Sequence, residues 1–168
     1  MQAIKTVLIG VTGSSFRTGK IDHHLTSQGL IEMRHALEQL TAENRKPKVI
    51  YCSTDPAHIA SAYMLAAHPS VDHVIPSKTL CFGRDDWFKE KRRLQDKLRE
   101  AFKTTYGAIE YLRRMASVRG NFEEVMVLTG QCWGNSFGYA GTWHRGALYS
   151  FDLNTQNIQV VGVHSVGI

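Results

Sequence analysis

The sequence predicts an α/β protein with a mostly parallel central sheet and an antiparallel hairpin near its C-terminal end. Two observations support this class. Short apolar runs alternate with segments of helical periodicity through the first half of the chain, which is typical of parallel strands joined by right-handed helical crossovers. Later, residues 146–152 and 157–163 are two strand-like runs with a short turn-like link between them. That pair indicates an added antiparallel edge of the sheet.

The size and composition of the chain are those of one globular domain, residues 1–168, with 43% hydrophobic and 21% charged residues. No apolar run approaches about 18 residues, so we expect no membrane span. The N-terminus lacks the layout of a signal peptide. Cys52, Cys81 and Cys132 stand at no metal-ligand spacing, and we expect a reduced, cytoplasmic protein without a bound metal or cofactor.

Four buried strands are expected before the C-terminal pair. They are the runs rich in β-branched and apolar residues at 4–10, 48–52, 71–75 and 124–129. The residues between the first strand and the first helix, 11–24, are expected to form a polar, glycine-bearing loop. In a parallel sheet, ligands sit outside the carboxyl ends of the strands, so two loops are candidate places for a site: 11–20 after the first strand and 129–138 after the strand at 124–129.

Capping signals place the starts of two helices. Thr26 or Ser27 is a suitable N-cap for the first helix. Ser53-Thr54-Asp55-Pro56 predicts the start of a second helix that runs to about Ala67, because it combines a capping side chain with proline in the first turn. The apolar residues expected on the buried face of the first helix are Leu30, Met33, Ala36, Leu37 and Leu40.

A long helical region is expected between residues 84 and 119. Its apolar stripe consists of Trp87, Leu94, Leu98, Phe102, Ile109, Leu112 and Met115. The same segment carries eleven Lys and Arg against six Asp and Glu, so it accounts for the whole formal net charge of +5. Such a segment is either a solvated helix face or a surface for acidic partners. Nucleic acid is an unfavoured partner, because no aromatic side chains interleave with the basic ones.

The stretch VLIGVTGSSFRTGK suggests a nucleotide-binding P-loop, but its spacing excludes one. Five residues separate Gly13 from Gly19 where the motif has four, and Ile21 follows Lys20 where a hydroxyl residue would bind Mg²⁺.

The chain resembles the histidine phosphatase superfamily, also called phosphoglycerate-mutase-like, over about residues 5–163. In that family a strand leads into Arg-His-Gly, and Leu-Thr-x-x-Gly opens the first helix. Here the strand leads into Val11-Thr12-Gly13, and the helix opens with Leu25-Thr26-Ser27-Gln28-Gly29. The segment YCSTDPAHIASAYMLA resembles the family's next strand and helix, and GALYSFDLNTQNIQVVGV resembles its closing hairpin. The resemblance implies a three-layer α/β/α fold.

The residues that carry the family's chemistry are replaced. The resemblance puts the nucleophilic histidine at Thr12, the arginine before it at Val11 and the second histidine at Gly130 or Thr129. His58 stands where an arginine that binds the phosphoryl group is expected.

The family's acid is expected after the third strand. The nearest position there is Phe82, with Asp85 and Asp86 close behind as possible acids. A threonine hydroxyl has a very high pKa and needs an adjacent base, and Val11, Gly13 and Ser14 supply none. We therefore expect a catalytically inactive phosphatase-like protein.

Polar residues around the former site still suit an anionic or phosphorylated ligand, or a protein partner. Either they line a retained binding cleft, or the loop only satisfies its own backbone. The candidate ligand-binding residues are Thr12, Gly13, Ser14, Ser15, Arg17, Ser53, His58, Thr129 and Gln131.

Two alternatives stay open. The first is a hydrolase of altered chemistry, in which Asp85 or Asp86 acts with His58 or with the Asp22-His23-His24 group. It predicts that one of these carboxylates and a histidine converge on the Thr12 loop. The second is a binder of acidic partners through residues 84–119. A homodimer is possible in either case.

Overall fold

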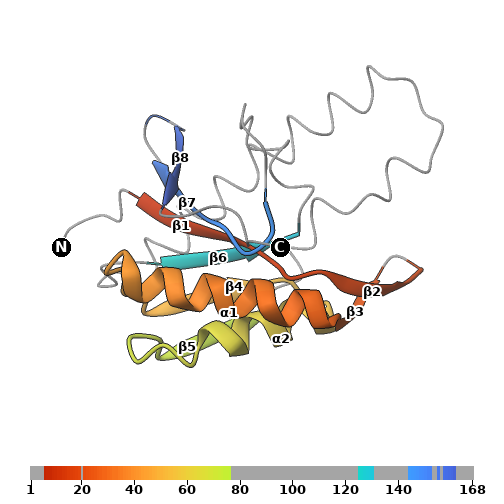
Figure 1. Cartoon of the computed structure of the whole chain (residues 1–168). Helices are drawn as coiled ribbons and strands as arrows, with labels where there is room; N and C mark the ends of the chain where they lie inside the picture. Colours follow the sequence, from red (N-terminus) through yellow and green to blue (C-terminus); the bar gives the residue numbers. More distant parts are fainter. Residues whose placement is uncertain are drawn as a thin grey trace, which may run out of the picture.

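The computed structural model describes residues 6–19, 21–76, 125–130, 144–152, 155 and 157–161. Within them the chain forms a six-stranded sheet, a separate two-stranded hairpin and two helices (Figure 1). The order of the strands in the large sheet is β5-β4-β6-β1-β7-β8. These strands are β1 (Thr6–Val11), β4 (Val49–Cys52), β5 (His73–Pro76), β6 (Val125–Thr129), β7 (Leu148–Asp152) and β8 (Ile158–Val161).

The pairing of the strands confirms the predicted sheet. Strands β5, β4, β6 and β1 are parallel neighbours, whereas β7 pairs antiparallel with both β1 and β8. In the β1–β6 register Val11 lies opposite Thr129. The carboxyl ends of β1, β4 and β6 therefore meet at one edge of the sheet, where the first candidate loop begins.

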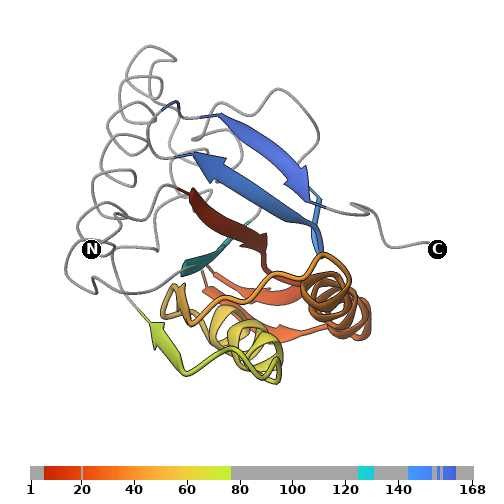
Figure 2. The ribbon, with the colours of Figure 1, turned by 90° about the vertical axis from the view of Figure 1, so that its left-hand side faces the viewer.

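The two described helices, α1 (Ser27–Ala42) and α2 (Pro56–Leu65), cover the same face of the sheet (Figure 2). Both crossovers, β1-α1-β4 and β4-α2-β5, step in the same direction along the sheet, so right-handed connections place both helices on one side. The core between helices and sheet contains Leu8, Met33, Ala36, Leu40, Ile50, Ala62, Leu65, Met126 and Leu128.

The opposite face of the sheet also carries buried side chains, because successive residues of a strand point to opposite faces. Its cluster contains Val7, Ile9, Val11, Tyr51, Val127, Tyr149 and Phe151. The long helical region expected over residues 84–119 lies outside the described residues, so the described part contains one of the two expected helical layers.

Helix α1 begins as predicted, with Thr26 as its N-cap and the Thr26 side chain accepting a hydrogen bond from Gly29 N–H at 3.0 Å. The expected burial of Leu30 is wrong, because this side chain is 46% exposed. The buried stripe runs through Gly29, Met33, Ala36 and Leu40, and Leu30 lies about 100° away from it.

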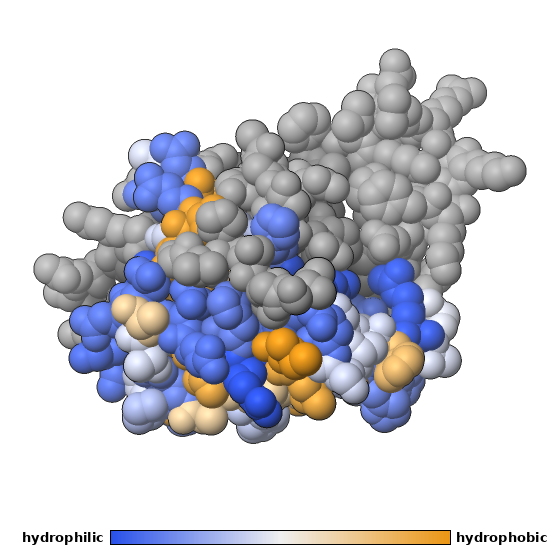
Figure 3. Space-filling view, viewed as in Figure 1, coloured by the Kyte–Doolittle hydropathy of each residue, from blue (hydrophilic) through white to orange (hydrophobic). Residues whose placement is uncertain are grey.

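Figure 3 shows the outer surface in this view as mainly hydrophilic, with separate hydrophobic side chains.

Residues 11–24 do not form the expected loop throughout. They contain the antiparallel hairpin of β2 (Ser15–Thr18) and β3 (Ile21–Leu25), which lies beyond the carboxyl end of β1 (Figure 1). Gly19 begins its turn with φ +61°, in the left-handed region that glycine adopts easily. All four side chains of β2 are exposed or half-buried, so the sequence has no apolar alternation to reveal the strand.

Helix α2 begins with Pro56 in its first turn, as predicted, and ends at Leu65, two residues before the expected end. Its N-cap, Asp55, makes no side-chain capping bond.

No helix among the described residues is long and apolar enough to cross a membrane. Cytoplasmic location and homodimer formation stay predictions.

Candidate functional site

A close contact between two glycines fixes the loop after β1. A Cβ at Gly13 would lie 2.6 Å from Gly29 O, and a Cβ at Gly29 would lie 2.1 Å from Ser14 O. Two hydrogen bonds stabilise the contact. Thr26 N–H donates to Ser14 O at 2.9 Å, and Ser14 N–H donates to Glu32 Oε1 at 2.8 Å. The backbone of residues 13–14 is therefore pressed onto the first turns of α1.

Three of the expected site positions meet at the carboxyl edge of the sheet. Val11 lies opposite Thr129 in the last pair of the β1–β6 register, and Thr12 and Gly130 directly follow these two residues. A Cβ at Gly130 would lie 3.6 Å from His58 Cε1 and 3.9 Å from His58 Nε2, in ordinary contact. His58 is 5% exposed and projects from the first turn of α2.

Both ring nitrogens of His58 are engaged. Ser53 Oγ lies 2.5 Å from Nδ1, and Asp22 Oδ2 lies 2.9 Å from Nε2. Asp55 N–H donates to Ser53 Oγ at 3.2 Å. With its proton on Nε2, the His58 ring donates to Asp22 and accepts from the Ser53 hydroxyl.

Asp22 reaches His58 from strand β3 of the hairpin. Its Oδ1 pairs with Arg17 Nε at 3.3 Å across the hairpin, and its own N–H donates to Asp55 Oδ2 at 3.2 Å. The hydrogen bond from His58 holds the pKa of Asp22 below its ordinary value of 3.8, against the opposing effect of burial. The positive charges of Arg17 and Arg145 act in the same direction as His58.

Arg145 brings a guanidinium to the same edge from the segment before β7. Its Nη1 donates to Thr12 O at 2.9 Å and to Gly13 O at 3.1 Å. The next residue, Gly146, has φ +76°, and a Cβ there would lie 2.8 Å from Glu32 O. Position 146 therefore requires glycine, because the chain passes close to α1 there as it brings Arg145 to the edge of the sheet.

The side chains of Val11 and Thr12 have different surroundings. Val11 belongs to the apolar cluster on the sheet face away from the helices. Thr12 is fully buried, and within the described part of the chain its hydroxyl has no hydrogen-bond partner. A buried hydroxyl in that state is costly unless a ligand supplies the partner.

Comparisons of the sequence with protein-family models and with curated proteins give no match. Solved structures match the whole chain at low identity. YhfR of Bacillus stearothermophilus has a TM-score of 0.66 and 14% identity, with 96% of this chain and 98% of that one covered. The α-ribazole phosphatase of Shigella flexneri has a TM-score of 0.61 and 11% identity over 97% and 98% of the two chains. The protein histidine phosphatase SixA, complexed with tungstate, has a TM-score of 0.61 and 13% identity over 92% and 93%.

The chain has the histidine phosphatase fold. This confirms the fold that the sequence resemblance implied. With sequence identity near 10%, the matches show only that the folds are alike. The chemistry of this chain must therefore be argued from its own residues.

Several predicted site residues lie together at the edge of this histidine phosphatase fold: Thr12, Gly13, Ser53, His58 and Gly130. Ser14 takes part through its backbone, and Arg17 through its ion pair with Asp22. Ser15 begins β2, half-buried. The side chain of Thr129, as well as Gln131, Asp85 and Asp86, lies outside the described residues.

The altered-chemistry alternative named Asp85 or Asp86 as the carboxylate, and both lie outside the described residues, so it stays a prediction. The described residues instead pair His58 with Asp22, a combination that the alternative did not name. The participation of Asp55 and Arg145 was not predicted. Asp55 had been considered only as part of the helix-start signal Ser53-Thr54-Asp55-Pro56.

The cluster of Asp22, Asp55 and His58 brings three ligand-type atoms within 4.8 Å of one another. Such a set could hold a metal ion. Here the atoms are hydrogen-bonded around Asp22, and the charges of Arg17 and Arg145 also act on Asp22. The positive charges of these two arginines would repel a metal cation at the same place, so we assign no metal to the cluster.

Proposed function

We propose that this chain binds an oxyanion or a phosphorylated ligand at the edge formed by Thr12, His58 and Gly130, without transferring a phosphoryl group through histidine. One observation carries the proposal. The two positions at which the resemblance expects reactive histidines hold a hydroxyl and a glycine, and His58 beside them is bound at both ring nitrogens.

The argument against phosphoryl transfer concerns the nucleophile. A histidine attacks phosphorus with a free ring nitrogen, and a threonine attacks only after a neighbouring base takes its proton. His58 offers neither, because Ser53 O–H occupies the lone pair on Nδ1 and Nε2–H is donated to Asp22. Losing the nucleophile and the arginine before it removes several kcal/mol of transition-state stabilisation, on the order of the effect of one catalytic donor or more.

The argument for anion binding concerns Arg145. Its contacts with the described residues use Nη1, whereas a guanidinium has five N–H donors. Within the described part of the chain, Nε and Nη2 therefore remain for a ligand. Arg17 adds a second positive charge, and the Thr12 hydroxyl adds a neutral donor. Among the structural neighbours, SixA is described with tungstate, and the mycobacterial glucosyl-3-phosphoglycerate phosphatase with VO3 and with inorganic phosphate. Oxyanions of this kind are therefore suitable probes.

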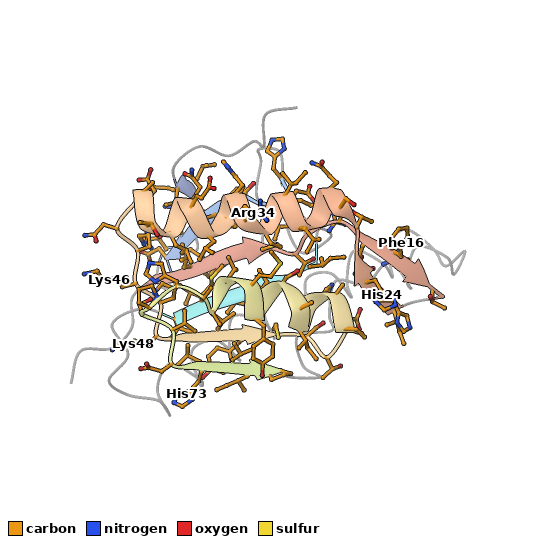
Figure 4. The ribbon with its side chains drawn as sticks, turned by 60° about the horizontal axis from the view of Figure 1, so that its bottom comes forward. Phe16, His24, Arg34, Lys46, Lys48 and His73 are labelled. Atoms are coloured by element: carbon orange, nitrogen blue, oxygen red, sulfur yellow. The ribbon has the colours of Figure 1, made fainter. Side chains whose placement is uncertain are left out.

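The proposal is tested by measuring binding and turnover on the same preparation. Titration calorimetry with tungstate and with orthophosphate should give saturable binding, and Arg145→Met should abolish it. Lys48→Met is the matched control, since it removes the same charge at the opposite end of the sheet (Figure 4) and should bind as the native chain does. Hydrolysis of p-nitrophenyl phosphate and of phosphohistidine should not exceed the buffer rate. Turnover that scales with protein and disappears in Thr12→Val would contradict the proposal.

A second candidate function is hydrolysis by the pair of Asp22 and His58, since the two groups lie 2.9 Å apart beside Gly130. It requires Ser53 to release Nδ1 so that the ring can take a proton from water. Asp22→Asn distinguishes the two functions. If the native chain is a hydrolase, the variant should lose the measured turnover; if the chain only binds anions, neither the native chain nor the variant should show turnover.

Ser53, His58 and Asp22 also contain the three groups of a serine hydrolase. Ser53 is fully buried and its oxygen accepts Asp55 N–H, so we assign it to positioning the His58 ring. A fluorophosphonate probe should therefore leave Ser53 unlabelled.

A further inference from the structure

The carboxylate of Asp22 has the surroundings of a bound anion. We infer that Asp22 is the built-in ligand of the anion site and that an incoming oxyanion must replace it. This inference rests on the proposed function, and it identifies the residue that decides which anions the site accepts.

The first support is the set of donors around Asp22. His58 Nε2–H donates to Oδ2 at 2.9 Å, and Arg17 Nε lies 3.3 Å from Oδ1. The charge of Arg145 acts on the same carboxylate. Each oxygen thus has its own donor, which is how proteins bind the oxygens of a small oxyanion.

The second support is the position of the carboxylate. His58 stands where the resemblance places an arginine that binds the phosphoryl group, and Gly130 beside it stands where the second histidine is expected. Asp22 is hydrogen-bonded to the residue at the phosphate-binding position. It therefore lies where an external phosphate would bind.

The third support is that the hairpin carries Asp22 into the site. Strands β2 and β3 form a sheet of their own, outside the hydrogen-bonded ladder of the six main strands. The Asp22 side chain is 18% exposed, in contrast to the fully buried strands beneath it. Asp22 can be displaced from His58 without breaking any pairing in the large sheet.

The hydroxyl of Thr12, which has no hydrogen-bond partner among the described residues, predicts which anions displace Asp22. A carboxylate ligand offers the same two oxygens that Asp22 already presents, and Asp22 has the advantage of being attached to the chain. A tetrahedral oxyanion has further oxygens for donors that Asp22 leaves unused, such as Thr12 O–H and Arg145 Nη2. We expect the site to select phosphate and tungstate over acetate.

The test compares the native chain with Asp22→Asn, which keeps the shape of the side chain and removes its charge. Titration calorimetry with orthophosphate and with tungstate, at fixed ionic strength, should give affinity about tenfold or more higher in the variant. Asp72→Asn is the charge-matched control, since Asp72 is exposed and pairs at 3.9 Å with Lys48; its affinity should equal that of the native chain. Adding Arg17→Met to Asp22→Asn should remove most of the gain.

The outcomes separate this inference from the proposed function. Binding by the native chain with no gain in Asp22→Asn overturns the inference and leaves the proposed function standing. Binding that appears only in Asp22→Asn supports the inference and contradicts the proposed function of the native chain. Absence of binding in both overturns both. A thermal melt of Asp22→Asn close to that of the native chain shows that a negative result is not due to unfolding.

Discussion

The glycine contact at Gly13 and Gly29 and the cluster at Thr12, His58 and Gly130 are separated by a single step along the chain. The first region holds the two glycines that the sequence resemblance expects, whereas the second holds threonine, histidine and glycine where the resemblance implies histidine, arginine and histidine. The difference follows from what each region must satisfy. A Cβ at Gly29 would lie 2.1 Å from Ser14 O, whereas a Cβ at Gly130 would lie 3.6 Å from the His58 ring. The packing of the fold and the chemistry of the site are therefore separate constraints on neighbouring residues.

The largest effect is expected in the glycine contact. Gly29→Ala forces the added Cβ against backbone that has no rotamer to change, and should cost about 3 kcal/mol or more of unfolding free energy. Gly130→Ala is the matched control and should cost less than about 1 kcal/mol, because its Cβ has room. Urea denaturation of both variants measures the difference; equal costs would remove the contrast between the two regions.

A smaller effect is expected at Ser53. Ser53→Ala removes the hydroxyl that donates to His58 Nδ1 and accepts Asp55 N–H, and should cost about 1–3 kcal/mol because both groups lose a buried partner. The chain offers a matched control in Ser70, whose hydroxyl also lies beside a histidine Nδ1, that of His68, at 2.8 Å. Ser70 is only half-buried, so Ser70→Ala should cost less. A larger cost at Ser70 than at Ser53 would argue against a tightly bound His58 ring.

Thr12→Val should stabilise the fold. The variant keeps the shape of the side chain and removes a buried hydroxyl without a partner among the described residues, so unfolding free energy should rise by about 1 kcal/mol. The same variant should weaken binding of orthophosphate. Denaturation and calorimetry on one preparation measure both changes, and a loss of stability would show that the hydroxyl has a partner after all.

A pH effect is expected at Asp22. Its pKa is lowered in the folded chain, so between that lowered pKa and the ordinary value of 3.8 the unfolded chain binds more protons. The stabilisation by Asp22 is complete above 3.8 and is lost as the pH falls through the folded pKa. Asp22→Asn should therefore flatten the acid side of the stability profile below about pH 4. Thermal melts across this range measure the slope, and an unchanged slope would contradict the pairing with His58.

The smallest effect is expected far from both regions. Lys48 and Asp72 form a 3.9 Å ion pair with both side chains about half exposed, at the end of the sheet opposite to the hairpin (Figure 4). Lys48→Ala should change the unfolding free energy by less than about 0.5 kcal/mol. A change as large as that of Ser53→Ala would mean that this exposed ion pair contributes as much to stability as the buried hydroxyl of the site.

The sequence predicted those features that depend on local chemistry. Thr26 capped its helix as expected, because the capping signal lies within three residues of its partner, Gly29. The central strands β1, β4 and β6 were identified from apolar runs, because they are buried on both faces. The hairpin of β2 and β3 was missed, since its exposed side chains carry no such pattern.

The arrangement of the site was only partly predictable. Thr12, His58 and Gly130 were brought together by the family resemblance. The bond of Asp22 to His58 spans 36 positions and depends on the unpredicted hairpin, so no local signal reveals it. Arg145 reaches Thr12 from 133 positions away, and its place depends on strand β7 lying beside β1.

Gly146 links the two regions compared above. It follows Arg145, and its left-handed backbone passes the carbonyl of Glu32, the residue whose side chain accepts the Ser14 N–H of the glycine contact. Any side chain at 146 would push this segment away from α1 and carry the guanidinium of Arg145 with it. Substitutions at 145 and 146 should therefore have non-additive effects on anion affinity. The Arg145 guanidinium can reach this edge only if residue 146 is glycine. The two positions are therefore expected to change together in any chain that keeps the site.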